Sequence, residues 1–69
     1  MDKQAASELM QEILKMTSQL NVIAAKVEQS TSGEELQMMR RHVAQVMAAC
    51  DENLFRPILR QHPELEPHP

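Results

Sequence analysis

A regular apolar stripe runs through the first part of the chain. Its members recur at alternating spacings of three and four residues, the pattern of a helix that packs lengthwise against other helices. The pattern predicts one long helix over 2–28, with Asp2 as its N-cap. Met10 and Leu14 lie beside the stripe and widen it. The stripe consists of Ala6, Leu9, Ile13, Met16, Leu20, Ile23 and Val27.

A single break interrupts the helical pattern in the middle of the chain. Residues 29–33 are small and polar and include the only glycine, which predicts a turn. Ser32 followed three residues later by Glu35 is the sequence of a capping box, in which each side chain satisfies a free N–H at the start of the next helix. Because the connection is short, the helices on either side of it should be antiparallel neighbours.

A second helical stripe follows the turn and predicts a helix over 33–55. Glu34 and Glu35 fall in its first turn, where the helix dipole favours negative charge. Either of two adjacent residues, Val46 or Met47, fits the period. The stripe consists of Leu36, Met39, Val43, Val46 or Met47, Cys50 and Leu54.

Pro57 leaves two alternatives for the end of this helix. A proline deep in a helix removes a hydrogen bond and biases the preceding residue, here Arg56, toward an extended conformation. Either the helix ends near Leu54, or a further short turn over 57–61 starts with Pro57 as its first residue. We favour the further turn, because it would let three large apolar residues fold back over the end of the hairpin: Phe55, Ile58 and Leu59.

The final segment, 61–69, contains three of the four prolines and one large apolar residue. That composition predicts an extended, mobile tail. The chain is therefore expected to comprise one helical hairpin domain over 1–60 followed by this tail.

Composition supports an all-α fold and points to self-association. Phe55 is the only aromatic residue among 69, and 42% of the residues are apolar, which argues against β structure. A chain this short buries little core, and one hairpin leaves each apolar stripe half covered. We therefore expect a homodimer in which two hairpins form a four-helix bundle, with its interface at the stripe residues from Leu9 to Leu54.

Charge and hydropathy argue against several classes of function. The net charge of −3 lacks the basic excess of a nucleic-acid module or a polybasic membrane anchor. The longest apolar run, 46–50, is far shorter than the roughly 20 residues that span a bilayer, and no signal-peptide core is visible. The single cysteine allows no internal disulfide. We expect a reduced, cytoplasmic protein without a membrane association.

The nitrogen and sulfur ligands show no metal-site spacing, so no metal and no other cofactor is expected. His42 and Cys50 are eight residues apart, whereas a helical pair of ligands is three or four apart, and His62 and His68 lie in the tail. Cys50 lies on the apolar stripe beside acidic residues, as a small buried hydrophobe and not as a nucleophile. No catalytic constellation is found, and an enzyme is not expected.

Two further groups of polar residues have a structural and a functional interpretation. Arg40 and Arg41 could contact phosphate, although adjacent arginines on a helix are more often solvated or paired with glutamates. Glu8 and Glu12 are spaced like paired carboxylates, but no Glu-x-x-His motif accompanies them, and Glu12 could pair with Lys15.

The six methionines could line an adaptable docking surface. Met16, Met39 and Met47 are more simply core residues, whereas Met10 and Met38 lie off the stripes and are better placed for exposed contacts.

Three functions are compatible with these patterns. The leading hypothesis is a small non-enzymatic interaction or assembly protein that acts as a helical-bundle homodimer. The first alternative is an RNA- or DNA-binding regulator that uses Arg40 and Arg41. The second is a chaperone or adaptor subunit that pairs with another helical protein.

Overall fold

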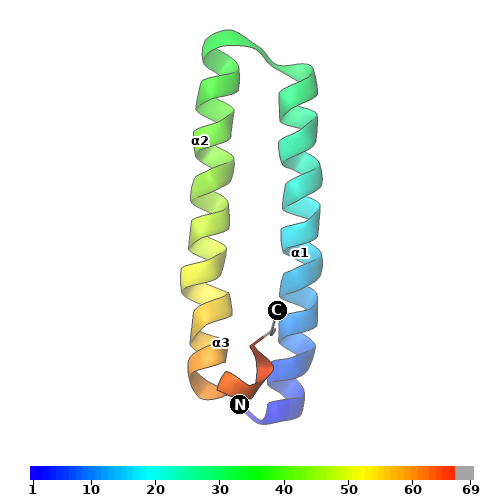
Figure 1. Cartoon of the computed structure of the whole chain (residues 1–69), viewed down its shortest axis with the longest axis vertical. Coiled ribbons are helices and arrows are strands. Elements are labelled where there is room, and N and C mark those ends of the chain that lie inside the picture. Colours follow the sequence, from blue (N-terminus) through cyan, green and yellow to red (C-terminus); the bar gives the residue numbers. More distant parts are fainter. Residues whose placement is uncertain (67–69) are drawn as a thin grey trace.

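The chain forms an antiparallel helical hairpin in the computed structural model, which describes residues 1–66. The two long helices are α1 (Lys3–Ser30) and α2 (Gly33–Cys50), and they run side by side from the loop at one end to the open end of the hairpin (Figure 1). A π-helical turn (Asp51–Phe55), α3 (Arg56–Gln61) and a 3-10 turn (Pro63–Leu65) complete the described part of the chain. These 66 residues contain helices and no strand, as the composition predicted.

The two ends of α1 show one confirmed cap and one longer boundary. The Asp2 side chain accepts a hydrogen bond from the Ala5 N–H at 2.8 Å, so Asp2 is the predicted N-cap. At the other end α1 continues through Ser30, two residues beyond the predicted end. Thr31 closes it, since its N–H and its hydroxyl both donate to the Val27 carbonyl, at 3.1 and 2.7 Å.

The predicted capping box at the start of α2 is wrong. Ser32 is the N-cap by position, but its hydroxyl caps no N–H of α2 in the described structure. The chain instead turns through Gly33, whose φ of +61° lies in the left-handed region that favours glycine. Glu34 and Glu35 do occupy the first turn of α2, as expected.

The helix after Cys50 continues past Pro57, which corrects the predicted extended conformation of Arg56. Arg56 is helical, with φ −62° and ψ −42°. The turn before it widens, so that the Arg56 N–H donates to the Asp51 carbonyl five residues earlier. A wide π turn accommodates the missing N–H and the ring of Pro57, which would clash with a regular preceding turn.

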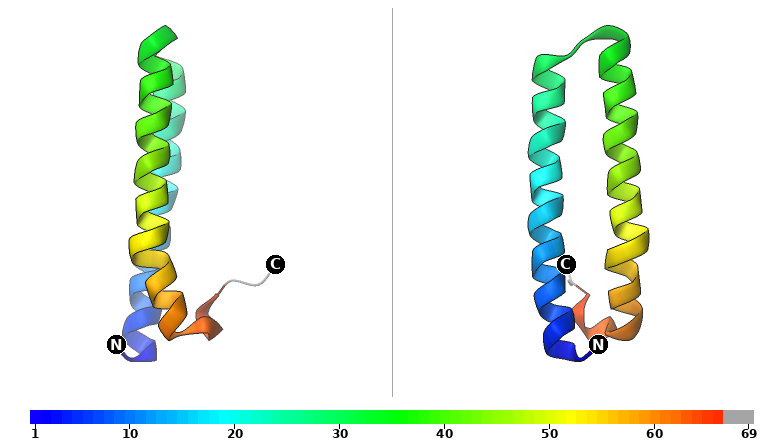
Figure 2. Two further views of the ribbon diagram at one scale, coloured as in Figure 1. Left: turned by 90° about the vertical axis from the view of Figure 1, so that its left-hand side faces the viewer. Right: turned by 180° about the vertical axis from the view of Figure 1, so that it is seen from behind.

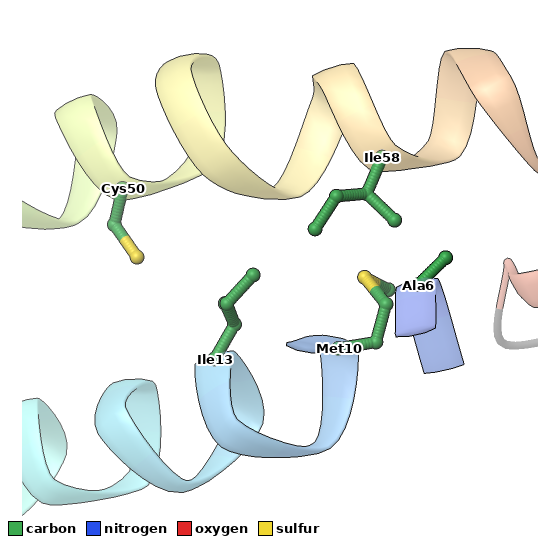
Figure 3. Packing of buried hydrophobic residues seen from close by; sticks show 5 residues of the cluster. All are labelled: Ala6, Met10, Ile13, Cys50 and Ile58. Carbon is green, nitrogen blue, oxygen red and sulfur yellow. The ribbon is translucent and has the colours of Figure 1, made fainter. Parts of the chain in front are cut away.

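The buried core lies at the open end of the hairpin. Ile13 of α1 points toward Cys50, and Ile58 lies against Met10 and Ala6 (Figure 3). The expected folding-back of the apolar residues after α2 is confirmed, since Phe55 and Leu59 pack half-buried against this cluster. Only Val27 is buried near the loop within the described residues.

The segment predicted to be an extended tail begins with ordered turns. Figure 2 shows the 3-10 turn after α3 lying to one side of the two long helices. The 3-10 turn brings Leu65 half-buried against the core cluster. His62 Nε2 lies 3.0 Å from the Met1 carbonyl oxygen, which joins this segment to the start of the chain. The remainder of the predicted tail, 67–69, lies outside the described residues.

The inner surface of α1 is a different line from the predicted stripe. Ala6, Ile13, Leu20 and Val27 do face α2, but the residues between them on this line are not the expected ones. Met10 is 5% exposed and belongs to the core, which confirms that it widens the stripe and corrects its assignment to exposed contacts. Leu14, predicted to widen the stripe with it, is 45% exposed. We call the residues that face α2, all of them buried or half-buried, the inner line: Ala6, Met10, Ile13, Thr17, Leu20, Ala24, Val27 and Thr31.

Candidate functional site

The remaining members of the α1 stripe form an exposed row beside the inner line. Leu9, Met16 and Ile23 are 45%, 41% and 41% exposed. They are seven residues apart, and seven residues are close to two turns of a helix, so the three side chains lie along one side of α1. The stripe thus divides into positions that hold the hairpin together and positions that the hairpin leaves uncovered.

A matching exposed row runs along α2 and the π turn. Of the two adjacent positions that fitted the α2 stripe, Met47 is half-buried toward α1, whereas Val46 is 52% exposed. Met47 therefore belongs to the contact within the hairpin and Val46 to the exposed row. Met39 lies one heptad before Val46 and is half-buried, and Leu54 in the π turn is 46% exposed. Leu36, Val43 and Cys50, also predicted as interface residues, are half-buried or buried.

The two rows lie on the same face of the hairpin. Leu9 and Met16 line one groove together with Leu54 and with Asn53, which is one heptad after Val46. Because residues at equal distances from the loop of an antiparallel hairpin lie at similar heights, we group the side chains of the two rows in three layers, with Met39 as the half-buried member. These layers define the exposed apolar face, which consists of Leu9 with Leu54, Met16 with Val46, and Ile23 with Met39.

A groove lies in this face at the open end of the hairpin. Its volume is about 360 Å³, and its walls come from α1, the π turn and α3. Apolar side chains provide almost all of the lining, with Glu12 and Asn53 as its polar members. Such a surface can hold apolar side chains of another helix, but it offers no convergent polar groups for chemistry.

The opposite face has an apolar hollow of its own, lined by Ala24, Val43 and Met47, and an ion pair beside it. Arg40 Nε and Glu28 Oε2 are 2.6 Å apart, and the second guanidinium nitrogen contacts the other carboxylate oxygen. The hydrogen bond from Arg40, assisted by its charge, holds the pKa of Glu28 below its ordinary value. Arg40 is therefore engaged with a carboxylate, while the adjacent Arg41 is exposed.

The other candidate groups lie apart from one another. His42 is exposed and Cys50 is buried, while His68 lies outside the described residues. Within residues 1–66 no three metal-ligating side chains gather. His62 Nδ1 lies 3.2 Å from Glu64 Oε1. The pKa of Glu64 is lowered mainly by a hydrogen bond with its own backbone and to a smaller extent by this contact with His62.

The paired glutamates and the remaining methionine lie at the surface. Glu8 and Glu12 are both exposed, and Glu12 accepts a hydrogen bond from Lys15 at 3.1 Å. Met38 is 48% exposed, as predicted.

The observed fold and surface of residues 1–66 define an all-α helical hairpin with an exposed apolar face. None of the helices within residues 1–66 has both the length and the apolar character needed to span a membrane. Comparisons of the chain with protein-family models, curated proteins and solved structures give no match.

Proposed function

We propose that this chain is a non-enzymatic assembly protein that dimerises through the exposed apolar face, so that two hairpins form a four-helix bundle. The observation that carries the proposal is the three-layer arrangement on that face. Helices whose apolar positions repeat every seven residues pack lengthwise against other helices. In the single hairpin this packing is satisfied on the inner line and unsatisfied on the exposed apolar face.

The surface area supports an additional interface. The chain exposes 5246 Å², whereas a compact monomer of this mass exposes about 4400 Å². The elongated shape, 46 by 22 by 16 Å, accounts for the larger surface. This larger surface leaves room for the roughly 800 Å² that each partner contributes to a standard protein interface.

The charges around the face fit a second copy of the same chain as the partner. Glu12 lines the groove, and Lys26 lies two heptads further along the same side of α1. Glu35 lies one turn before Met39 on α2. A border that carries both signs does not repel its own copy, as a border of one sign would. A symmetric pair also buries the same apolar face on both chains.

Adjacent residues of α1 provide a matched test. Ile23 lies on the exposed apolar face, and Val22 is on the far side of the same helix with a similar exposure of 47%. Light scattering after gel filtration, over a hundredfold dilution series, should give a dimer mass for the natural chain and for Val22→Glu. Ile23→Glu should give a monomer, because it would bury a carboxylate in an apolar interface.

Two results would contradict the proposal. One is a natural chain that stays monomeric at every concentration, which would leave the face for a different helical protein. The other is an Ile23→Glu variant that dimerises as tightly as Val22→Glu, which would place the interface elsewhere on the hairpin.

A further inference from the structure

The exposed apolar face is not uniform along its length. At the open end it is hollowed by the groove beneath Leu9 and Leu54, which extends to Pro57 and Ile58. Toward the loop it carries Ile23, 41% exposed, in one layer with the half-buried Met39. A hollow in the loop half lies between Ala24, Arg40 and Ala44, on the opposite face with the Glu28–Arg40 ion pair.

Two symmetric arrangements would bring two such faces together. With the twofold axis along the helices, both loops lie at the same end and each layer meets its own copy. With the axis across the helices, the loops lie at opposite ends and the central layer of Met16 and Val46 meets itself. In both arrangements every helix has antiparallel neighbours, so helix direction does not distinguish them.

Shape distinguishes the two arrangements. With the loops together, two grooves of about 360 Å³ would face each other, and their lining would lose packing contacts across the hollow. With the loops at opposite ends, each groove would face the partner's loop half. Ile23 and Met39 of the partner subunit would then enter the groove beside Leu9 and Leu54, and the symmetry would repeat this contact at the other end.

We infer that the hairpins pair with their loops at opposite ends, and that each groove receives Ile23 and Met39 of the partner subunit. The inference rests on the proposed dimer and specifies its geometry. It identifies the partner of the groove as the loop half of a second copy and places Met16 at the twofold axis.

Spin labels at the loop can test this arrangement directly. Ser32 is exposed in the loop, and a Ser32→Cys label in a Cys50→Ala background gives one label per chain. Helices of this length rise about 1.5 Å per residue, so labels on opposite ends should be on the order of 45 Å apart. If the loops lay together, the two labels would be separated only by the width of the bundle, roughly 20 Å or less.

A second variant tests the axis itself. Met16→Cys in the same background should form a disulfide-linked dimer under mild oxidation, because the two copies of this residue meet at the axis. Val22→Cys, on the far side of α1, should not.

The light-scattering mass separates the possible failures. A dimer with a short Ser32 distance and no Met16→Cys cross-link would overturn this geometry and leave the proposed dimer intact. A monomer at every concentration would overturn the dimer and this arrangement together.

Discussion

Met10 provides the sharpest test of how the hairpin is held together. The side chain is 5% exposed and packs with Ala6, Ile13 and Ile58 in the core at the open end. Met10→Ala removes the thioether and its methyl group from that cluster. The matched control is Met38→Ala, because Met38 is the same residue type on α2 and is 48% exposed.

The expected cost follows from the burial. Truncation of a core methionine to alanine costs about 2 to 5 kcal/mol. Met10 should fall near the lower end, at about 2 to 3 kcal/mol, because this core is one side chain deep and can partly collapse. A domain of this size has a total stability of roughly 3 to 10 kcal/mol, so the variant should lose a large fraction of it. Met38→Ala should change stability by less than about 0.5 kcal/mol.

Urea unfolding followed by circular dichroism measures both values. All proteins should be compared at one concentration, because self-association would add concentration-dependent stability. In thermal unfolding, Met10→Ala should lower Tm by about 10 to 20 °C. Equal effects of the two substitutions would refute the assignment of Met10 to the core and of the inner line to the hairpin interface.

Three further predictions concern the caps, the loop and the surface ion pair. In urea unfolding, Asp2→Ala should destabilise the hairpin by about 1 kcal/mol, whereas Ser32→Ala should cost less than about 0.5 kcal/mol. The reason is that Asp2 caps its helix through its side chain and Ser32 does not. Equal losses of stability would contradict this difference. Gly33→Ala should cost about 1 kcal/mol in the same assay, because φ is +61° and an added Cβ would meet no atom within 4 Å, so backbone strain alone acts; an unchanged stability would contradict that strain. Arg40→Ala should lower the stability of the hairpin at neutral pH. This difference from the natural chain should vanish as the pH falls through the lowered pKa of Glu28, because the ion pair stabilises the fold only while the Glu28 carboxyl is ionised. A difference that persisted in strong acid would refute the stabilising role of the ionised Glu28.

Periodicity predicts the architecture of this chain well, because the hairpin depends on features that one sequence displays. The two stripes, the polar break and the single glycine together indicate two antiparallel helices. The Asp2 cap and the folding-back of Phe55 and Ile58 are equally local, since each depends on residue type and near neighbours.

The division of the α1 stripe was harder to predict. A seven-residue repeat contains two overlapping lines that share Ala6, Ile13, Leu20 and Val27. Leu9, Met16 and Ile23 complete the more apolar line, whereas the line that faces α2 includes Thr17 and Ala24. Hydrophobicity alone selects the first line. Attention to a second line at the same spacing, with small residues that permit close approach, would have identified Met10 as buried.

The end of the second helix shows why residue preferences can fail in context. Proline biases Arg56 toward extended backbone, but one wide turn removes the clash at the cost of a single irregular hydrogen bond. The burial of Ile58 and Leu59 rewards continued helix, and neither contribution is visible from the local sequence of Arg56.

The position of the core also affects how the chain reaches its folded state. The loop brings nearby residues together first, but in the described structure that end buries Val27 alone, whereas Ile13, Cys50 and Ile58 lie at the far end. The strongest contacts therefore join residues that are distant in sequence, and their closure entropy must be overcome before they form. We expect a transition state in which the open end is already assembled, so that folding is slower than the short loop would suggest and unfolding begins at the loop.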